Sequence, residues 1–175
     1  MKANFTTSSE VFSVRPFEVR DREAVLGLWP ADLMHSQPGA QTIDLLMNSV
    51  EGAIAGKHHV WVAEDVEAVP RIVGAVAVIT DNAWLAHLRY LYIAPDVTER
   101  HVVARSLAET AIRHAWERGY LKLLVRSNSP PCRPAAFLHD LGFEFSRENT
   151  MGEEHVLEFY LNLYERPRPS LSRAG

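Results

Sequence analysis

The order of the predicted elements indicates an α/β (α+β) fold, with a single mixed sheet of about seven strands flanked by about four helices. Three observations predict it. Residues 60–80 hold two β-branched runs joined by a turn, residues 104–117 follow a long amphipathic helical pattern, and two alternating strands lie between residues 143 and 165. Of the 175 residues, 47% are hydrophobic and 23% are charged, which suffices for one core but not for two ordinary domains.

The first half of the chain is predicted to form a strand, two helices, a hairpin and a further strand. Residues 11–17 alternate like a half-buried strand, and Asp21 is placed to cap the helix that follows. A second helical pattern covers residues 42–55. Residues 60–80 are typical of an antiparallel hairpin, and the next strand runs over about residues 84–94.

The second half is predicted to form a long helix, a strand, a short helix and a terminal hairpin. Apolar side chains recur every three or four residues over 104–116, and Gly119 ends this helix. A strand at residues 121–125 follows. Pro134 in a first helical turn then opens a short helix that stops at Gly142.

Composition and charge narrow the classes of partner. The net charge of −4 gives no broad electrostatic footprint for nucleic acid. No apolar run approaches the roughly 20 residues that span a bilayer, and no signal-peptide core is present, so we expect no membrane partner and a cytoplasmic protein. We also expect a flexible N-terminus at residues 1–10, one domain over residues 11–166 and a disordered tail at residues 167–175.

Several kinds of site are disfavoured by spacing. His58 and His59 are adjacent and face opposite sides of an extended segment, and the chain has no His-x-x-x-His or Cys-x-x-Cys pair, so no metal site is expected. A Gly-x-Ser-x-Gly elbow and a Walker-type loop are also absent, which argues against hydrolase and phosphate-transfer chemistry.

The most informative segment runs from Leu88 to Leu107 and reads LRYLYIAPDVTERHVVARSL. It resembles the coenzyme A-binding segment of the GNAT N-acetyltransferases, in which a strand and a Val-x-Pro-like step lead to Arg/Gln-x-x-Gly-x-Gly/Ala at a helix start. The later FLHDLGFEF is similar to that family's Phe-Tyr-x-x-Leu-Gly-Phe motif. With the element order over about residues 11–164, this resemblance implies the GNAT (acyl-CoA N-acyltransferase) fold.

The loop departs from the family's pattern because it contains no glycine. With Ala104 on the last motif position, Glu99 stands on the first and Val102 on the first glycine. A helix N-terminus can still hold a pyrophosphate through backbone N–H groups and its partial positive charge. Glycine is favoured there because phosphate approaches the backbone closely and some positions need positive φ, which valine resists. The alternative is a plain strand-to-helix connection whose anion site has decayed.

The resemblance implies acetyl-CoA, or a related acyl-CoA, as donor and no metal. The backbone at the end of the strand would pair with the pantetheine arm, and the start of the helix would hold the pyrophosphate, with three basic side chains adding positive charge. The implied cofactor-binding residues are Leu91, Tyr92, Ile93, Arg100, His101, Val102, Val103, Ala104 and Arg105.

The resemblance also implies transfer of an acetyl or other acyl group to a primary amine. The position of the family's strand carboxylate holds His87, whose ordinary pKa of about 6.5 suits a general base. The alternative role for His87 is packing on the strand. The position of the family's tyrosine acid holds Leu138, which cannot donate a proton, so Tyr92 or Tyr90 is the candidate donor, with packing again as the alternative. An acyl-cysteine route through Cys132 is a minor alternative, because a lone cysteine without a histidine partner is usually inert.

Acceptor recognition in this fold usually falls to the first helix-loop-helix and the last hairpin. The substrate-binding candidates are Trp29 and His35, with Asp32, Met34 and Gln37 beside them and Glu148, Glu153 and Glu154 in the last hairpin. The acidic residues among these would suit a cationic acceptor, and the alternative is that they are solvated loop residues. The acceptor would be a small-molecule or peptide amine, and a homodimer is compatible with the strand edges of this fold. Two other functions stay open: a catalytically impaired GNAT-fold binding or regulatory protein, and a GNAT-like enzyme with a different donor.

Overall fold

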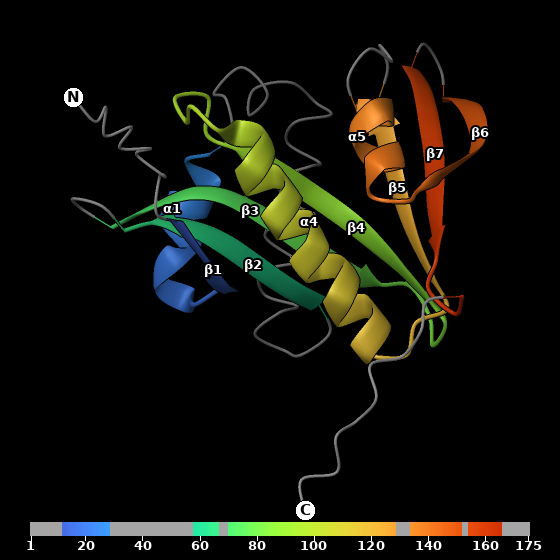
Figure 1. Ribbon diagram of the computed structural model, residues 1–175, viewed down its shortest axis with the longest axis horizontal. Helices are drawn as coiled ribbons and strands as arrows, with labels where there is room; N and C mark the ends of the chain where they lie inside the picture. Colours follow the sequence, from blue (N-terminus) through green and yellow to red (C-terminus); the bar gives the residue numbers. More distant parts are fainter. Residues whose placement is uncertain (1–11, 29–57, 67–69, 129–133, 152–153, 166–175) are drawn as a thin grey trace, which may run out of the picture. The chain divides into compact units, whose positions relative to one another are not determined.

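A computed structural model describes residues 12–28, 58–66, 70–128, 134–151 and 154–165 of the protein. Its strands form one mixed sheet in the order β1-β2-β3-β4-β5-β7-β6 (Figure 1), which confirms the predicted sheet. The strands are β1 (Phe12–Pro16), β2 (His58–Asp65), β3 (Arg71–Thr80), β4 (Leu85–Ile93), β5 (Lys122–Asn128), β6 (Glu144–Met151) and β7 (Glu154–Asn162). The described helices are the 3₁₀ turn η1 (Val19–Asp21), α1 (Arg22–Leu26), α4 (Arg100–Glu117) and α5 (Pro134–Asp140).

The chain forms two compact units. The first unit comprises Met1–Ala77 and Tyr90–Ala108, and the second comprises Val78–Arg89 and Glu109–Gly175. The helix predicted over residues 42–55 and both predicted flexible ends lie outside the described residues. No helix in the described part of the chain has the length and apolar character needed to cross a membrane.

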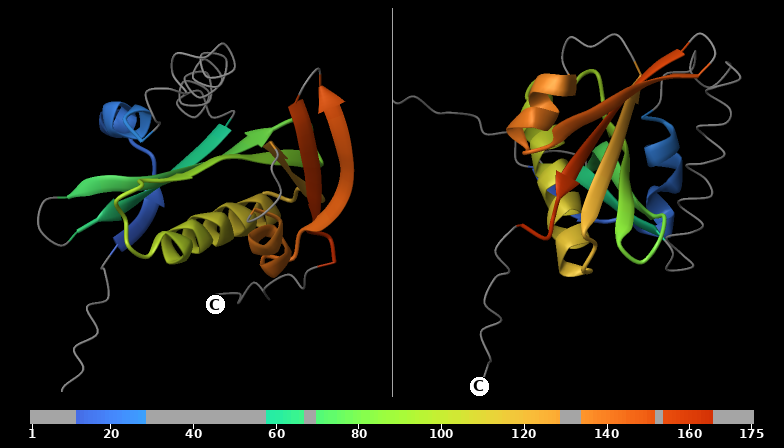
Figure 2. Two further views of the ribbon diagram at one scale, coloured as in Figure 1. Left: turned by 90° about the horizontal axis from the view of Figure 1, so that it is seen from above. Right: turned by 90° about the vertical axis from the view of Figure 1, so that its right-hand side faces the viewer.

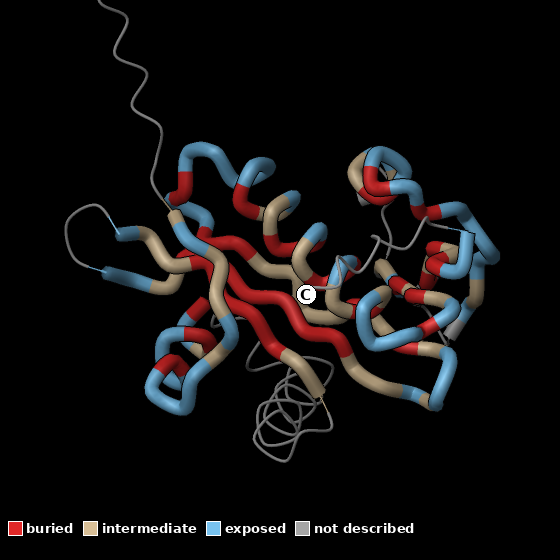
Figure 3. The backbone as a smooth tube through the Cα atoms, turned by 60° about the horizontal axis from the view of Figure 1, so that its bottom comes forward, coloured by how far each residue is buried: buried red, intermediate tan, exposed pale blue. Residues whose placement is uncertain are grey.

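In the first unit, β1 pairs antiparallel with β2 from Phe12 opposite Asp65 to Pro16 opposite Trp61. Buried positions run along β2 and β3 (Figure 3), because both faces of these strands are covered. α1 lies over one face, and the first turns of α4 lie over the other (Figure 2). Gly74 on β3 is a close-packing position: a Cβ there would lie 2.8 Å from Ile93 Cδ1 and 3.0 Å from Leu107 Cδ1.

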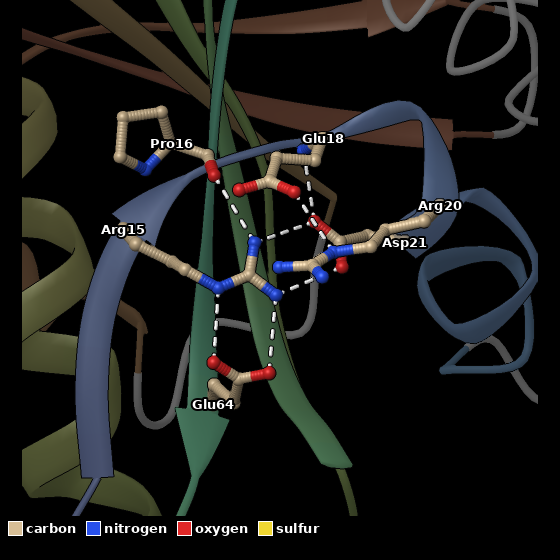
Figure 4. Close-up of polar contacts among 6 residues, drawn as sticks. All are labelled: Arg15, Pro16, Glu18, Arg20, Asp21 and Glu64. Atoms are coloured by element: carbon tan, nitrogen blue, oxygen red, sulfur yellow. Dashed lines mark hydrogen bonds and ion pairs between the residues drawn. The ribbon is translucent and has the colours of Figure 1, made fainter. Parts of the chain in front are cut away.

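An arginine-centred ion-pair network, the Arg15 node, joins β1 to β2 and to the turn before α1 (Figure 4). Arg15 donates two hydrogen bonds to Asp21, at 2.7 and 2.8 Å, and two to Glu64, at 2.9 and 3.1 Å. These bonds hold the pKa of Asp21 and of Glu64 below the usual carboxyl range and raise that of Arg15. Asp21 is 5% exposed, so the node fixes the start of α1 on the sheet.

Asp21 stands at the N-cap position of α1, as predicted, but it does not cap that helix with its side chain. Its carboxylate instead accepts from Arg15 and, at 2.8 Å, from the backbone N–H of Glu18. The expectation of side-chain capping was wrong, because a guanidinium from a neighbouring strand competes for the same oxygens with stronger, charge-assisted bonds.

In the second unit, β4 pairs in parallel with β5 from Leu85 to His87, and β7 pairs antiparallel with both β5 and β6. The two faces of β5 and β7 differ because side chains alternate along a strand. One face is apolar, and its buried residues are Leu123 and Val125 of β5 and Phe159 and Leu161 of β7. The segment that contains α5 packs on this face and contributes the buried Leu138, Leu141 and Phe143. The other face, called here the polar face, carries His87, Lys122, Leu124, Arg126, Glu158, Tyr160 and, from β6, Glu144 and Arg147.

Candidate active site

The start of α4 lies in the first unit, and six residues (94–99) separate it from the end of β4. The N–H groups of Val102 and Val103 both donate to the carbonyl of Glu99, at 2.9 and 3.3 Å, so Glu99, on the first motif position, directly precedes the helix. Arg100 Nη2 donates to the carbonyl of Ile93 at 3.2 Å. The Arg100 side chain therefore ties the helix start to the end of β4, in addition to carrying positive charge there.

The two valines of the loop occupy different environments. Val102, on the first glycine position, is 37% exposed, whereas Val103 is 1% exposed and belongs to the core. Both have helical backbone, and Tyr90 is the non-glycine residue with positive φ in the described ranges. Neither valine therefore needs a positive φ, and the glycine-free loop is made tighter only by the side chain of Val102.

The alternation of buried and exposed side chains along β4 is interrupted at Tyr90, where φ is 57°. Ala86 and Leu88 are buried before this residue, and Ile93 is buried after it, so the buried positions move from even to odd numbers. Tyr92 is half-buried beyond the irregularity, and the N–H of Ala94 donates to the carbonyl of Val73 at 2.8 Å. The end of β4 is thus anchored to β3.

His87 lies in the second unit, on the polar face, opposite Leu124 of β5. Its side chain is 14% exposed, and its Nε2 lies 3.8 Å from Asp81 Oδ2, which is too far for a hydrogen bond. Its Nδ1 is buried and has no hydrogen-bond partner among the described residues. Burial, followed by the positive charge of Arg89 and despite the opposing effect of Asp81, lowers the pKa of His87 below 6.5. The imidazole is therefore neutral at neutral pH.

The residues beside His87 on the polar face were not predicted as functional. Glu158 accepts one hydrogen bond from Arg126 and one from Arg147, each 3.0 Å long. Tyr160 donates to Glu144 at 2.7 Å, and this bond raises the pKa of the Tyr160 phenol. The signal was present in the sequence, since the inward alternation of Leu157, Phe159, Leu161 and Leu163 places Glu158 and Tyr160 outward, but alternation alone does not reveal which strands are neighbours.

The other predicted site residues fall into three groups. Glu148 is exposed on β6, opposite Leu157, and is not one of the residues that share the polar face with His87. Leu138 is buried in α5, so the position of the family's tyrosine is part of the core here. The remaining candidates lie outside the described residues; they are Trp29, Asp32, Met34, His35, Gln37 and Cys132, together with Glu153 and the side chain of Glu154. Among the residues that the structure describes, no group of three or more histidine, cysteine or carboxylate side chains gathers as metal ligands.

The family model for the acetyltransferase (GNAT) family matches residues 26–143. The chain belongs to the GNAT acetyltransferase family. This membership confirms the resemblance found in the residue 88–107 segment, and it makes the protein a GNAT-type acyltransferase. A search of curated proteins found no match to the chain.

Solved structures share the GNAT fold at low sequence identity. yncA from Salmonella typhimurium, whose structure holds its cofactor acetyl-CoA, is 16% identical, with 91% of this chain and 98% of that chain covered and a TM-score of 0.69. The aminoglycoside 6'-N-acetyltransferase from Enterococcus faecium is 11% identical, with coverage of 89% and 99% and a TM-score of 0.66. The spermidine/spermine N-acetyltransferase SpeG from Vibrio cholerae is 17% identical, with coverage of 87% and 92% and a TM-score of 0.64.

Proposed function

We propose that this GNAT protein transfers an acetyl group, or a related acyl group, from acyl-CoA to a primary amine, and that His87 is the general base. The observation that carries the proposal is the neutral imidazole on the polar face, at the strand position where the family often has a carboxylate. Near neutral pH, a neutral imidazole can accept a proton from the acceptor's ammonium group before attack, or from the amine nitrogen as it attacks the thioester. Family membership and neighbours named for aminoglycosides and spermidine support an amine acceptor.

The proposed donor site is the start of α4. An 18-residue helix presents unpaired N–H groups and a partial positive charge at its first turn, where a pyrophosphate is stabilised. Arg100 and Arg105 are exposed there and add positive charge, and the exposed imidazole of His101 offers a further hydrogen-bond donor. The helical backbone at Val102 fits this use, because the phosphate contacts come from the backbone and the exposed valine only narrows the approach. Leu91, Tyr92, Ile93, Val103 and Ala104 would complete the site through their backbone.

The bound donor would supply the acetyl group as a thioester. His87 would take the proton that the amine nitrogen loses as it becomes an amide, and Asp81 would stabilise the resulting imidazolium through its negative charge. Tyr92 is the proposed donor of a proton to the departing thiolate. Trp29 and His35 remain the proposed residues for acceptor binding.

The first test is isothermal titration with acetyl-CoA, with dephospho-CoA as the comparison, followed by an amine screen that measures release of free coenzyme A. We expect saturable binding at micromolar concentrations. His87→Gln should leave that binding unchanged and reduce transfer by about 10²- to 10⁴-fold, the usual contribution of a general base. The exposed His139 of α5 provides the matched control, His139→Gln, which should leave transfer unchanged. Absence of binding at millimolar acetyl-CoA would refute the proposal.

A catalytically impaired binding protein is the second candidate, and two observations favour it. Val102 covers backbone that a glycine would leave bare, and Leu138 removes the family's tyrosine acid. This candidate predicts acetyl-CoA binding without coenzyme A release for any amine. A GNAT-like enzyme with another donor predicts neither acetyl-CoA binding nor coenzyme A release.

We also propose that the protein is cytoplasmic and forms a homodimer. Fractionation of cells tests the location, and analytical ultracentrifugation tests the dimer.

A further inference from the structure

The polar face of the second unit holds two arginines on one buried carboxylate. Glu158 of β7 is 3% exposed, and its two oxygens accept from different strands: Oε2 from Arg126 Nε of β5 and Oε1 from Arg147 Nε of β6, both at 3.0 Å. The arginine side chains themselves are 40% and 60% exposed. Burial acts to raise the pKa of Glu158, but the two arginine hydrogen bonds outweigh it and keep the carboxyl ionised.

The arrangement leaves most of the arginine donors available. A guanidinium has five N–H donors, and each of these arginines spends the one on Nε. Neither arginine has a further partner for its terminal nitrogens in the described part of the chain. A single cation would neutralise Glu158, so the second arginine leaves a net positive charge on this face. Two partly exposed guanidiniums fixed at Nε are well suited to bind an oxyanion with their Nη groups.

A β-bulge is responsible for the position of Arg147. Phe145 pairs with Phe159 on the apolar face, and the register then shifts so that Arg147, rather than Ser146, stands opposite Glu158. Without the extra residue, Arg147 would lie on the apolar face. Bulges often re-aim a side chain next to a functional site. The backbone irregularity thus serves to bring a second guanidinium to a carboxylate that already had one.

The arginine pair lies beside the proposed base. His87 stands opposite Leu124, and Arg126 is two residues further along β5 on the same face, which places the two Cα atoms about 8 Å apart from ordinary strand spacings. The positive charge of Arg126 also contributes to the lowered pKa of His87. An acceptor whose amine reaches His87 therefore meets positive charge from Arg126, and from Arg147 beyond it.

In the Arg15 node of the first unit, by contrast, the charges compensate one another. That node lines an open pocket of about 660 Å³, in which Arg15 pairs with Asp21 and Glu64, Arg20 pairs with Glu18, and Arg71 pairs with Asp96. These three arginines thus have four carboxylate partners, of which Asp21, Glu64 and Asp96 line the pocket itself. Of these two arginine sites, only the pair on Glu158 has an excess of cations.

We infer that Arg126 and Arg147 form an oxyanion subsite beside His87, and that the acceptor is an amine that also carries a carboxylate or a phosphate. This inference deepens the proposed function and rests on it for the role of the bound amine. A polyamine or aminoglycoside would bring further positive charge to this face and be repelled. This inference differs from the expectation of a cationic acceptor based on the acidic residues of the last hairpin, and the amine pairs below distinguish the two.

The subsite itself is tested without turnover. Guanidinium Nε–Hε signals of the ¹⁵N-labelled full chain are followed by NMR during titration with sodium acetate and with sodium phosphate, and are assigned with Arg126→Gln and Arg147→Gln. Both signals should shift saturably, and loss of either arginine should weaken the remaining affinity about 10- to 100-fold. The exposed Arg113 of α4 is the internal control. Shifts no larger than those of Arg113 overturn the subsite.

The acceptor class is tested with pairs of amines that differ by one anion. Tyrosine is compared with tyramine, histidine with histamine, and lysine with cadaverine; phosphoethanolamine against ethanolamine separates phosphate from carboxylate recognition. The anionic member should have a kcat/KM at least about tenfold higher, mainly through KM, and Arg126→Gln or Arg147→Gln should abolish this advantage, whereas Arg113→Gln should not. Equal or better use of the anion-free amines overturns the inference while transfer itself stands. If acetyl-CoA neither binds nor reacts, the proposed function fails, and the NMR titration still decides the subsite.

Discussion

The charge on His87 is set by neighbours from two strands and one turn. Burial favours the neutral imidazole, and Arg89 and Arg126 act in the same direction, whereas Asp81 favours the imidazolium. The groups with opposite effects on the His87 pKa come from different parts of the chain: Asp81 follows the end of β3, and Arg126 lies on β5. A neutral imidazole can accept a proton, and the Asp81 carboxylate 3.8 Å away then stabilises the imidazolium that forms.

We expect the loss of kcat/KM in acid to have its midpoint below pH 6.5, because His87 must be neutral to act as base and its pKa is lowered. This midpoint is called the acid limb below. Asp81→Asn should move this limb to lower pH, since it removes the charge that favours the imidazolium. Arg126→Gln should move it to higher pH, since it removes a charge that opposes the imidazolium. The His87 Cε1–H signal, titrated by NMR without substrates, should shift in the same two directions. Equal profiles for both variants would contradict this account, and Arg113→Gln is the control for loss of a remote charge.

The strand–loop–helix segment of the first unit depends on a close approach at Gly74. Its missing Cβ would meet Ile93 Cδ1 and Leu107 Cδ1 and would lie 3.1 Å from the backbone oxygen of Tyr92. The two side-chain ends can rotate away, but the Tyr92 carbonyl cannot move without moving the end of β4. That strand end leads directly to the proposed donor site.

Gly74→Ala should therefore destabilise the protein by about 1 to 3 kcal/mol and also weaken acetyl-CoA binding, because the overpacked strand shifts the start of α4. The matched variant is Gly119→Ala, where φ is 85° and no atom lies near the added methyl group. This variant should lower the free energy of unfolding by about 1 to 2 kcal/mol through backbone strain and leave acetyl-CoA binding unchanged. Urea unfolding and isothermal titration measure the two effects. Equal losses of affinity in both variants would mean that the close approach does not support the loop.

The elements differ in how far they were predictable. The apolar period of α4 and its end at Gly119 are local properties of the sequence, and both predictions are confirmed. The phase change at Tyr90 and the bulge between Phe145 and Arg147 were not predicted. Neither position holds the glycine that often marks an irregularity in a strand, so the sequence carries no local signal for either one.

Each compact unit contains an ionised carboxylate held by arginine. In the first unit, the hydrogen bonds of Arg15 depress the pKa of Asp21 below 3.8. In the second unit, Glu158 is held below 4.5 by Arg126 and Arg147 against the effect of burial. A carboxyl with a depressed folded-state pKa contributes stability that is complete above its unfolded pKa and is lost as pH falls toward the folded value. Acid should therefore loosen both units.

We expect Tm to fall steeply with pH below about pH 5, the upper edge of the range in which these carboxyls begin to take up protons. Asp21→Asn should destabilise the protein by about 2 to 4 kcal/mol at pH 7. Glu158→Gln should cost about 1 to 3 kcal/mol, because its arginines are partly exposed and screened by solvent. Both variants should show a flatter decline of Tm with acid than the wild type. Glu117→Gln, an exposed carboxylate on α4, should run parallel to the wild type, and parallel curves for all three would rule out this role.

The sequence by itself predicted the described strands and helices, the mixed sheet and the family, because period-2 and period-3.6 patterns and short motifs are local, and it nominated His87 as the base that we propose. It also identified the glycine-free loop, although the helical backbone that makes valine acceptable there became clear only from the structure. The tertiary structure decided the neutral state of His87, the competition of Arg15 for Asp21, and the meeting of Arg126, Arg147 and Glu158. Those last contacts join residues 32 and 11 positions apart through strand register and a bulge, and register is set by packing of whole faces rather than by any short segment.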